Sequence, residues 1–191
     1  DNVCTDGGNI VIMDPNNGDI LAMAGYPTYN LNDPYVPMDS KVSANWDNLS
    51  KEEKTAEQQK MWRNKAISDA YEPGSTFKMV TAIAGLETGA ITTKERINDT
   101  GVYRKYNMEW KCWYYTSYHR GHGYQNVTQA LQHSCNYFFY ETGDRMGIDN
   151  LNKYAKYFGL GTKTGIELPN ETAGTLASKD YVKSIKQNWN P

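Results

Sequence analysis

Ser75 and Lys78 stand three positions apart in the run Pro-Gly-Ser-Thr-Phe-Lys at 73–78. On a helix this spacing places both side chains on one face. A serine hydroxyl becomes a useful nucleophile when a neighbouring base takes its proton, and a lysine whose pKa is lowered by burial can be that base. A helix N-terminus at Ser75 would also stabilise a developing oxyanion. The pair therefore predicts nucleophilic serine chemistry, with an N-cap and a solvated lysine as the alternative.

A second hydroxyl and an amide occur at Ser134 and Asn136, on either side of Cys135. Residues two apart do not share a helix face, so both can reach one cleft only from a turn between helices. From such a turn Ser134 could relay a proton to a leaving group, and Asn136 could bind a substrate amide through its donor and its acceptor. The alternative is a pair of capping residues at a helix junction.

The elements that must position these residues begin with a β-hairpin. Two apolar runs, 10–13 and 20–23, flank a segment dense in turn-forming residues, which predicts two paired strands. Neither run alternates, so we expect both faces to be covered, as in a sheet between helical layers. Residues 26–50 are expected to form a loop, and a polar helical stretch should follow over about 51–69.

A nucleophile helix is expected over 75–89, because apolar positions recur on one of its faces and Gly89 is a suitable stop. Residues 90–160 are expected to form a mainly helical subdomain that carries the Ser-x-Asn motif. Its first part, 95–125, has no periodicity and should be irregular. The remainder from 161 to 191 should be loop.

Three helices are expected in the second part of that subdomain. Thr128 could cap the first, which ends at Gln132. The second should span 137–145, with Gly147 past its end, and Asp149 could cap the third.

Composition limits the classes of function. The chain has 191 residues and a net charge of −2. There is no basic field to hold a polyanion, so we expect no nucleic-acid partner.

Cysteine usage argues against a disulfide framework and a metal centre. The chain has three cysteines, Cys4, Cys112 and Cys135, which is an odd number, and they are widely spaced. Cys135 is expected to be a small buried hydrophobe. His119 and His122 lie near Cys112, but one cysteine and two histidines at these spacings match no zinc pattern. We therefore expect loop packing for these residues, with no metal and no organic cofactor.

Taken together, the motifs resemble the transpeptidase domain of penicillin-binding proteins. The likeness is carried by residues 71–78, by His122-Gly123 and by residues 130–138. Residues 63–69 resemble the lead-in of the class B members, and the hairpin resembles the first two strands of that domain. The resemblance runs from about Gly8 to Gly174.

This resemblance implies an α/β (α+β) fold of the penicillin-binding-protein and serine β-lactamase type. It would be incomplete here, with residues 8–25 forming the N-terminal hairpin of the central antiparallel sheet. Both ends of the chain are expected to be cuts in a longer protein. That parent is expected to be membrane-anchored, outside the cytoplasmic membrane, in a cell-wall synthesis complex.

The same resemblance implies roles for the four polar residues. Ser75 would be acylated by the penultimate D-alanine of a peptidoglycan stem peptide, with Lys78 as its base. Ser134 would assist proton transfer, and Asn136 would hold the substrate backbone. The implied activity is that of a peptidoglycan D,D-transpeptidase, whose serine β-lactams also acylate.

The family also needs a Lys-Thr/Ser-Gly motif on a strand. Lys163-Thr164-Gly165 is rejected for this role, because its neighbours resemble the loop that follows the Ser-x-Asn helices. The third motif is expected beyond Pro191, so the isolated chain should be inactive or weakly active. The open edge of the hairpin should then invite pairing with another chain.

Two other functions stay open at this point. A class D serine β-lactamase also carries Ser-Thr-Phe-Lys, although its second motif differs. A penicillin-sensing or structural module would bind without catalysing cross-linking.

Overall fold

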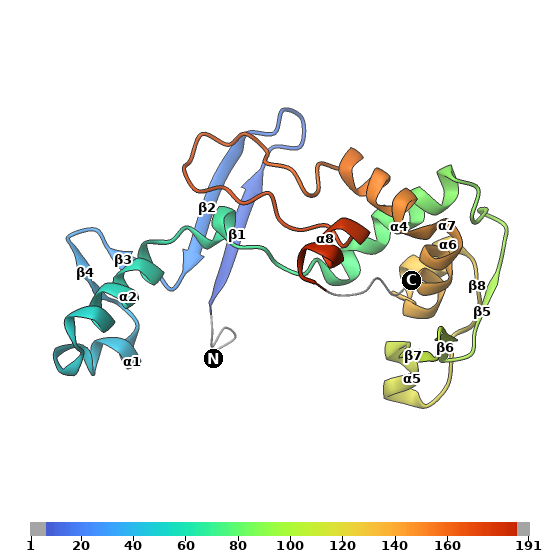
Figure 1. Cartoon of the computed structure of the whole chain (residues 1–191), viewed down its shortest axis with the longest axis horizontal. Coiled ribbons are helices and arrows are strands. Elements are labelled where there is room, and N and C mark those ends of the chain that lie inside the picture. Colours follow the sequence, from blue (N-terminus) through green and yellow to red (C-terminus); the bar gives the residue numbers. More distant parts are fainter. Residues whose placement is uncertain (1–6, 187–191) are drawn as a thin grey trace. The chain divides into compact units, whose positions relative to one another are not determined.

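The computed structural model describes residues 7–186, and Cys4 lies outside them. The chain divides into two compact units, Asp1–Ala70 with Ile166–Thr172, and Tyr71–Gly165 with Ala173–Pro191. Figure 1 shows the order of the elements along the chain.

The first unit contains the hairpin that the apolar runs predict. Strand β1 (Gly8–Met13) pairs antiparallel with β2 (Ile20–Tyr26), and a register shift follows Ile12. The expectation that both faces are covered is wrong for the described chain, since Ile10 and Leu21 are each 66% exposed. Within residues 7–186 the two strands pair only with each other, and the segment Lys65–Ser68 contacts both strands but leaves most of the hairpin exposed.

Residues 26–50 are not the expected loop. They form β3 (Tyr29–Asn30), β4 (Asp33–Pro37), the helical turn α1 (Ser40–Ser43) and the 3₁₀ turn η1 (Trp46–Asn48). Side chains of the following helix hold β4 in place, because Trp62 Nε1 donates to Pro34 O at 2.7 Å. Such contacts between distant residues leave no local pattern in the sequence.

The expected polar helix over 51–69 is two helices, α2 (Lys51–Trp62) and α3 (Lys65–Ser68). The break falls at Arg63, which is extended, and Asn64 caps the second helix by accepting from Ala66 N at 3.2 Å.

The core of the second unit lies between α4 (Lys78–Glu87) and α7 (Asn136–Tyr157). Helix α4 buries Val80, Thr81 and Ala84, the face that the sequence predicts. Gly85 lets the two helices approach closely, because a Cβ there would lie 2.6 Å from Thr142 Cγ2. The helix stops as expected, with Gly89 at a φ of 72°.

Residues 95–125 are more regular than expected. Strand β5 (Ile97–Asp99) pairs with β8 (Gly123–Gln125), and β6 (Val102–Lys105) pairs with β7 (Met108–Lys111). Helix α5 (Trp113–Tyr118) follows β7. These strands are too short for alternation to be visible in the sequence, which is why the prediction was wrong here.

Helix α6 (Val127–Gln132) begins at a cap other than the expected Thr128. The Asn126 side chain accepts from Gln129 N at 2.9 Å, and Gln129 Oε1 accepts from Asn126 N at 3.1 Å. This reciprocal capping box fixes the start of the helix.

Helix α7 contains both of the later helices that the sequence predicts. They meet at a kink where Gly147 has a φ of 74°, in agreement with a break near Gly147. The expected loop beyond 161 contains α8 (Lys179–Ser184), capped by the Ser178 hydroxyl. Among residues 7–186, no helix has the length and apolar character needed to cross a bilayer.

Candidate active site

Ser75 lies in a 3₁₀ turn, η2 (Gly74–Phe77), that leads directly into α4. Gly74, with a φ of 55°, makes the entry into this turn, a conformation that favours glycine. The Thr76 hydroxyl donates to Pro73 O at 2.6 Å and holds the turn closed. Ser75 is therefore exposed at the start of a helical segment, where developing negative charge is favoured.

Lys78 is the first residue of α4, and its Nζ lies 3.2 Å from Ser75 Oγ. Burial lowers the pKa of Lys78 below the ordinary lysine value, although the nearby thiols of Cys112 and Cys135 act in the opposite direction. A lowered pKa increases the neutral fraction of the amine at a given pH, which a base needs.

Ser134 and Asn136 reach the same place from the junction between α6 and α7. Ser134 has a φ of 49°, and its hydroxyl donates to Ser75 Oγ at 3.0 Å. Lys78 Nζ lies 2.9 Å from Ser134 Oγ, 2.8 Å from Ser134 O and 2.5 Å from Asn136 Oδ1. The structure thus brings all four sequence-predicted site residues together around one amine.

Trp113 is part of this arrangement and was missed by the sequence reasoning. Its Nε1 donates to His133 O and to Ser134 O, each at 3.1 Å. The indole therefore holds the backbone of the turn that presents Ser134. The only signal in the sequence was its membership of an aromatic-rich segment, which does not single it out.

Lys163 belongs to a loop that follows α7, and Lys163–Gly165 does not form a strand. The rejection of Lys163 as the third motif stays a prediction.

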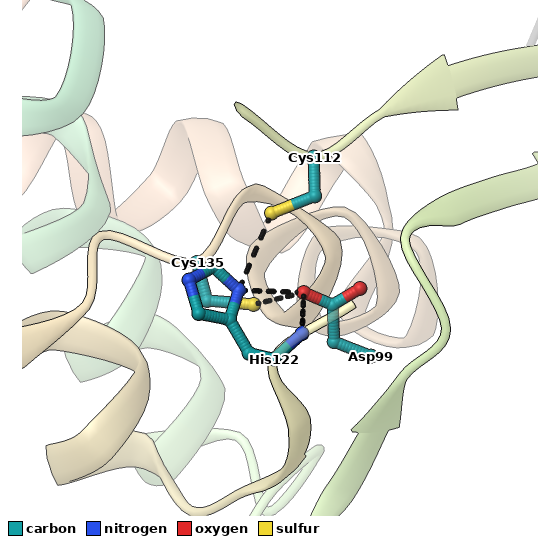
Figure 2. A group of neighbouring side chains, drawn as sticks. All are labelled: Asp99, Cys112, His122 and Cys135. Carbon is teal, nitrogen blue, oxygen red and sulfur yellow. Dashed lines mark hydrogen bonds and ion pairs between the residues drawn. The ribbon is translucent and has the colours of Figure 1, made fainter. Parts of the chain in front are cut away.

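A second polar cluster, Asp99–Cys112–His122–Cys135, includes the residue between Ser134 and Asn136 (Figure 2). One ligand atom from each residue lies within 4.8 Å of the others. His122 Nδ1 is 2.7 Å from Asp99 Oδ2 and 3.6 Å from Cys112 Sγ. Cys135 Sγ donates to Asp99 Oδ2 at 3.2 Å, so Cys135 is buried among polar groups and is more than the expected hydrophobe.

Hydrogen bonds within this cluster favour the charged form of Asp99. Burial opposes ionisation of Asp99, but hydrogen bonds from His122, Gly101 and Cys135 outweigh it and keep the Asp99 pKa below its ordinary value. Hydrogen bonding between the two thiols lowers the pKa of Cys112 and raises that of Cys135.

Two sulfurs, an imidazole nitrogen and a carboxylate oxygen are a donor set that a zinc ion accepts. The four residues could therefore hold such an ion. Loop packing was expected for Cys112, His119 and His122. Of these, His119 is exposed and is not part of the cluster. Asp99 and Cys135 come from other segments, so no spacing pattern linked them to it.

Sequence comparison with known proteins identifies relatives of this chain. A sequence profile described as the penicillin binding protein transpeptidase domain matches residues 8–188. The chain is 32% identical over 186 residues to the peptidoglycan D,D-transpeptidase MrdA of Acinetobacter baumannii, covering 95% of this chain and 26% of MrdA. It is 35% identical over 183 residues to stage V sporulation protein D of Bacillus subtilis, covering 95% of this chain and 25% of that protein.

Solved structures agree with the sequence relatives. The chain superposes on the penicillin-binding protein PBP2 of Helicobacter pylori, solved in complex with MreC, with a TM-score of 0.76 and 30% identity. This match covers 96% of the chain and 32% of PBP2. The chain thus spans about a quarter of the length of the curated relatives it matches. The profile match over nearly the whole chain, together with these relatives, shows that the chain belongs to the penicillin-binding protein transpeptidase domain family.

Proposed function

We propose that this chain supplies the nucleophile side of a peptidoglycan D,D-transpeptidase that acts through Ser75. The observation that carries the proposal is the convergence of Ser75, Ser134 and Asn136 on the amine of Lys78. A nucleophile, a base and a second hydroxyl within hydrogen-bonding distance of one another are what serine acyl transfer requires.

In the proposed reaction, neutral Lys78 takes the proton of the Ser75 hydroxyl as Oγ attacks the carbonyl of the penultimate D-alanine. The terminal D-alanine leaves as its amine accepts a proton relayed from Lys78 through the Ser134 hydroxyl. The Ser75 ester then reacts with an amine of a neighbouring stem peptide. As the new amide bond forms and the Ser75 Oγ–C bond breaks, Ser134 and Lys78 take a proton from the attacking amine and deliver one to Ser75 Oγ, which restores the free serine.

Asn136 has two tasks in this proposal. Its Oδ1 accepts from Lys78, and its NH₂ group remains able to donate to a substrate carbonyl. The Ser75 N–H would be one donor of the oxyanion hole, where a lost donor costs about 10²–10³ in rate.

The isolated chain should be a weak catalyst. Lys163–Gly165 lies in a loop and is not proposed as the third motif. That motif and the second oxyanion donor are proposed to come from further residues of the whole protein. The open edge of β1, exposed along its apolar run, is proposed to pair with a strand of the same domain or with a second copy of the chain.

The proposed partners are D-Ala-D-Ala stem peptides and β-lactams, with a membrane-anchored parent on the outer face of the cytoplasmic membrane. A cell-wall synthesis complex is also proposed, since the Helicobacter pylori relative was solved with MreC.

The test is acylation of the full-length protein by a fluorescent penicillin. We expect a long-lived label on Ser75 that the Ser75→Ala variant loses. Stem-peptide cross-linking should be lost with it. Rapid release of the label would indicate a β-lactamase, whereas stable labelling without cross-linking would indicate a sensing module.

A further inference from the structure

A cavity of about 570 Å³ lies between the β6–β7 hairpin, α7 and the first residue of α8, within the second unit. This volume is in the range of small-molecule sites. The cavity has an aromatic wall and a polar rim, supplied by Tyr103, Tyr106, Tyr140, Asp144, Asp149 and Asn150. The residues that contact Lys78 are not among those that line it, so it is a second, separate candidate site.

We propose that this cavity binds a sugar ring of the glycan strand that carries the stem peptide. The ligand class is a neutral, N-acetylated pyranose. The C–H face of such a ring can lie against an aromatic side chain while its hydroxyl and amide groups form hydrogen bonds. This inference rests on the proposed function for the source of the sugar, whereas the ligand class follows from the walls of the cavity.

The aromatic rings form a connected wall. The ring centroids of Tyr103 and Tyr140 are 6.1 Å apart, and Trp110 packs against both of them. Tyr106, at the tip of the β6–β7 hairpin, is 44% exposed, and its hydroxyl donates to Asp144 Oδ1 at 2.9 Å. Rings held in this way offer apolar contact area at low cost in conformational entropy, which suits a ligand with an apolar face and polar edges.

The charges at the rim are paired, which favours a neutral ligand. Lys105 forms an ion pair with Asp144, and Lys179 Nζ donates to Asp149 Oδ2 at 3.0 Å. Burial opposes ionisation of Asp144, but hydrogen bonds from Lys105 and Tyr106 outweigh it and keep the Asp144 pKa below its ordinary value. With a lysine beside each carboxylate, the rim favours neither a cation nor an anion. Its oxygens and N–H groups can still bind hydroxyl groups.

One buried hydroxyl at the wall also fits a ligand that carries an acceptor. Tyr103 is 6% exposed, and within residues 7–186 its hydroxyl has no hydrogen-bond partner. Burial, together with the charges of Glu141 and Asp144, raises the pKa of Tyr103, so the hydroxyl keeps its proton and can donate. A sugar hydroxyl or the carbonyl oxygen of an N-acetyl group is an acceptor of the kind that would satisfy it.

The cavity lies along α7 from the candidate active site. Asn136, Tyr140 and Gly143 share one face of this helix, because they are four and three residues apart. At a rise of about 1.5 Å per residue, Gly143 is about 10 Å along the helix axis from Asn136. A stem peptide of about five residues spans at most about 17 Å when extended. A peptide bound at Ser75 by its D-alanine end can therefore place the sugar at its other end in the cavity.

Two variants are designed to block the site without disturbing the fold. Gly143 lines the cavity, and a Cβ there meets nothing within 4 Å, so the side chain of Gly143→Leu should extend into open space and fill the cavity. Tyr106→Asn removes one aromatic ring, and asparagine tolerates the φ of 52° at this turn. Lys156→Leu is the matched control, because it adds the same side chain at an exposed position of α7 outside the cavity.

The experiment uses full-length protein and these three variants, with the melting temperature of each as a check on folding. The probe is N,N′-diacetylchitobiose, a neutral disaccharide without peptide, and its binding is measured by saturation-transfer NMR and by titration. The comparison ligand is the deacetylated disaccharide, which has the same rings but carries ammonium groups. Labelling of each protein by a fluorescent penicillin is measured in parallel.

We expect saturable binding of the acetylated disaccharide to the unmodified protein and to Lys156→Leu. Binding to Gly143→Leu and Tyr106→Asn should be weaker by about tenfold or more. The deacetylated disaccharide should bind less tightly than the acetylated one. The proposal is overturned if the full-length protein shows no saturable binding, which includes the case in which another part of the protein fills the cavity. Undiminished binding to a folded Gly143→Leu variant, or tighter binding of the ammonium form, would also overturn it.

Two further readouts separate this inference from the proposed function. Penicillin has no sugar ring, so labelling of Ser75 should be the same in all the variants. If no penicillin labels Ser75 in any of them, the proposed function fails, and the disaccharide titration still decides whether the cavity binds a sugar. In cross-linking assays, Gly143→Leu should raise the KM for stem peptides attached to glycan and leave the KM for free stem peptides unchanged. An equal effect on both substrates would contradict the assignment to the glycan of the substrate.

Discussion

Lys78 Nζ and Asn136 Oδ1 lie 2.5 Å apart, across the interface between the first residue of α4 and the first residue of α7. The amide oxygen thereby orients a lysine whose charge burial opposes. Lys78 Nζ also has Ser75 and Ser134 oxygens within hydrogen-bonding distance. The ammonium form of Lys78 has three protons to donate. The neutral amine has two N–H groups and a lone pair, so it can accept from the Ser75 hydroxyl and still donate to the other oxygens.

Replacing Lys78 by Met should abolish most acylation of Ser75. General base catalysis contributes about 10²–10⁴-fold to rate, and the labelling rate of full-length protein with a fluorescent penicillin should fall by that order. Lys163→Met is the matched control, because this loop lysine belongs to the rejected Lys-Thr-Gly. A comparable loss in the control would assign the base or the third motif to Lys163 instead.

The acylation rate should rise with pH through the pKa of Lys78. Burial lowers that pKa, so the inflection should lie below the ordinary lysine value of about 10.4. The folded state binds this proton less tightly than the unfolded state does. Between the lowered and the ordinary pKa, the Lys78 contribution to stability therefore increases as pH rises. A pH–rate profile on full-length protein tests this, and an inflection at or above the ordinary value would contradict it.

Trp113→Phe should slow acylation by about tenfold, because loss of a positioning contact allows the Ser134 turn to shift. The phenyl ring keeps the aromatic packing but cannot donate to Ser134 O and His133 O. Trp110→Phe is the control, since Trp110 packs against Tyr103 and Tyr140 and has no such donor role at the turn. A positioning role lowers the limiting rate at saturating penicillin. A change only in the penicillin concentration that gives the half-maximal rate would argue against this role.

The grouping of the four candidate site residues into two pairs could be predicted, because the members of each pair are only two or three positions apart in the sequence. Ser75 and Lys78 lie on one helical turn, and the Ser134–Asn136 pair needs only a break between two helices. The hairpin of β1 and β2 was equally visible, because dense turn formers separate two apolar runs. In each case neighbours in sequence are also neighbours in space.

The buried cluster could not be predicted for the opposite reason. Asp99 ends β5, Cys112 precedes α5, His122 precedes β8 and Cys135 caps α7. Four single residues on four segments have no spacing pattern, and only the pairing of β5 with β8 brings two of them together. Strands of three residues carry too little alternation to predict that pairing.

Gly85→Ala should destabilise the packing of α4 on α7, although alanine is the better helix former. The added Cβ would lie 2.6 Å from Thr142 Cγ2, and overpacking of this kind costs about 1–3 kcal/mol. Gly143→Ala in α7 is the matched control, because a Cβ there meets nothing within 4 Å and should be neutral or stabilising. Denaturant unfolding of the full-length variants measures both.

A compensating change makes the Gly85 prediction sharper. Thr142→Ser removes the methyl group that the new Cβ would meet, and it keeps the hydroxyl that donates to Phe138 O at 2.8 Å. The double variant should recover part of the stability lost in Gly85→Ala. Strictly additive free energies of unfolding would show that the two side chains do not meet.

Zinc should stabilise the reduced protein through the Asp99–Cys112–His122–Cys135 cluster. A ligand that binds the folded state raises its stability by mass action, and about 1 kcal/mol corresponds to roughly 2–4 °C in Tm for a domain of this size. Chelator-treated full-length protein with Cys4→Ser, kept reduced, should therefore show a higher Tm after zinc is added. His122→Ala in the same background should lose this increase, whereas His119→Ala should keep it, because His119 is exposed and outside the cluster. An equal increase in both histidine variants would mean that zinc binds elsewhere.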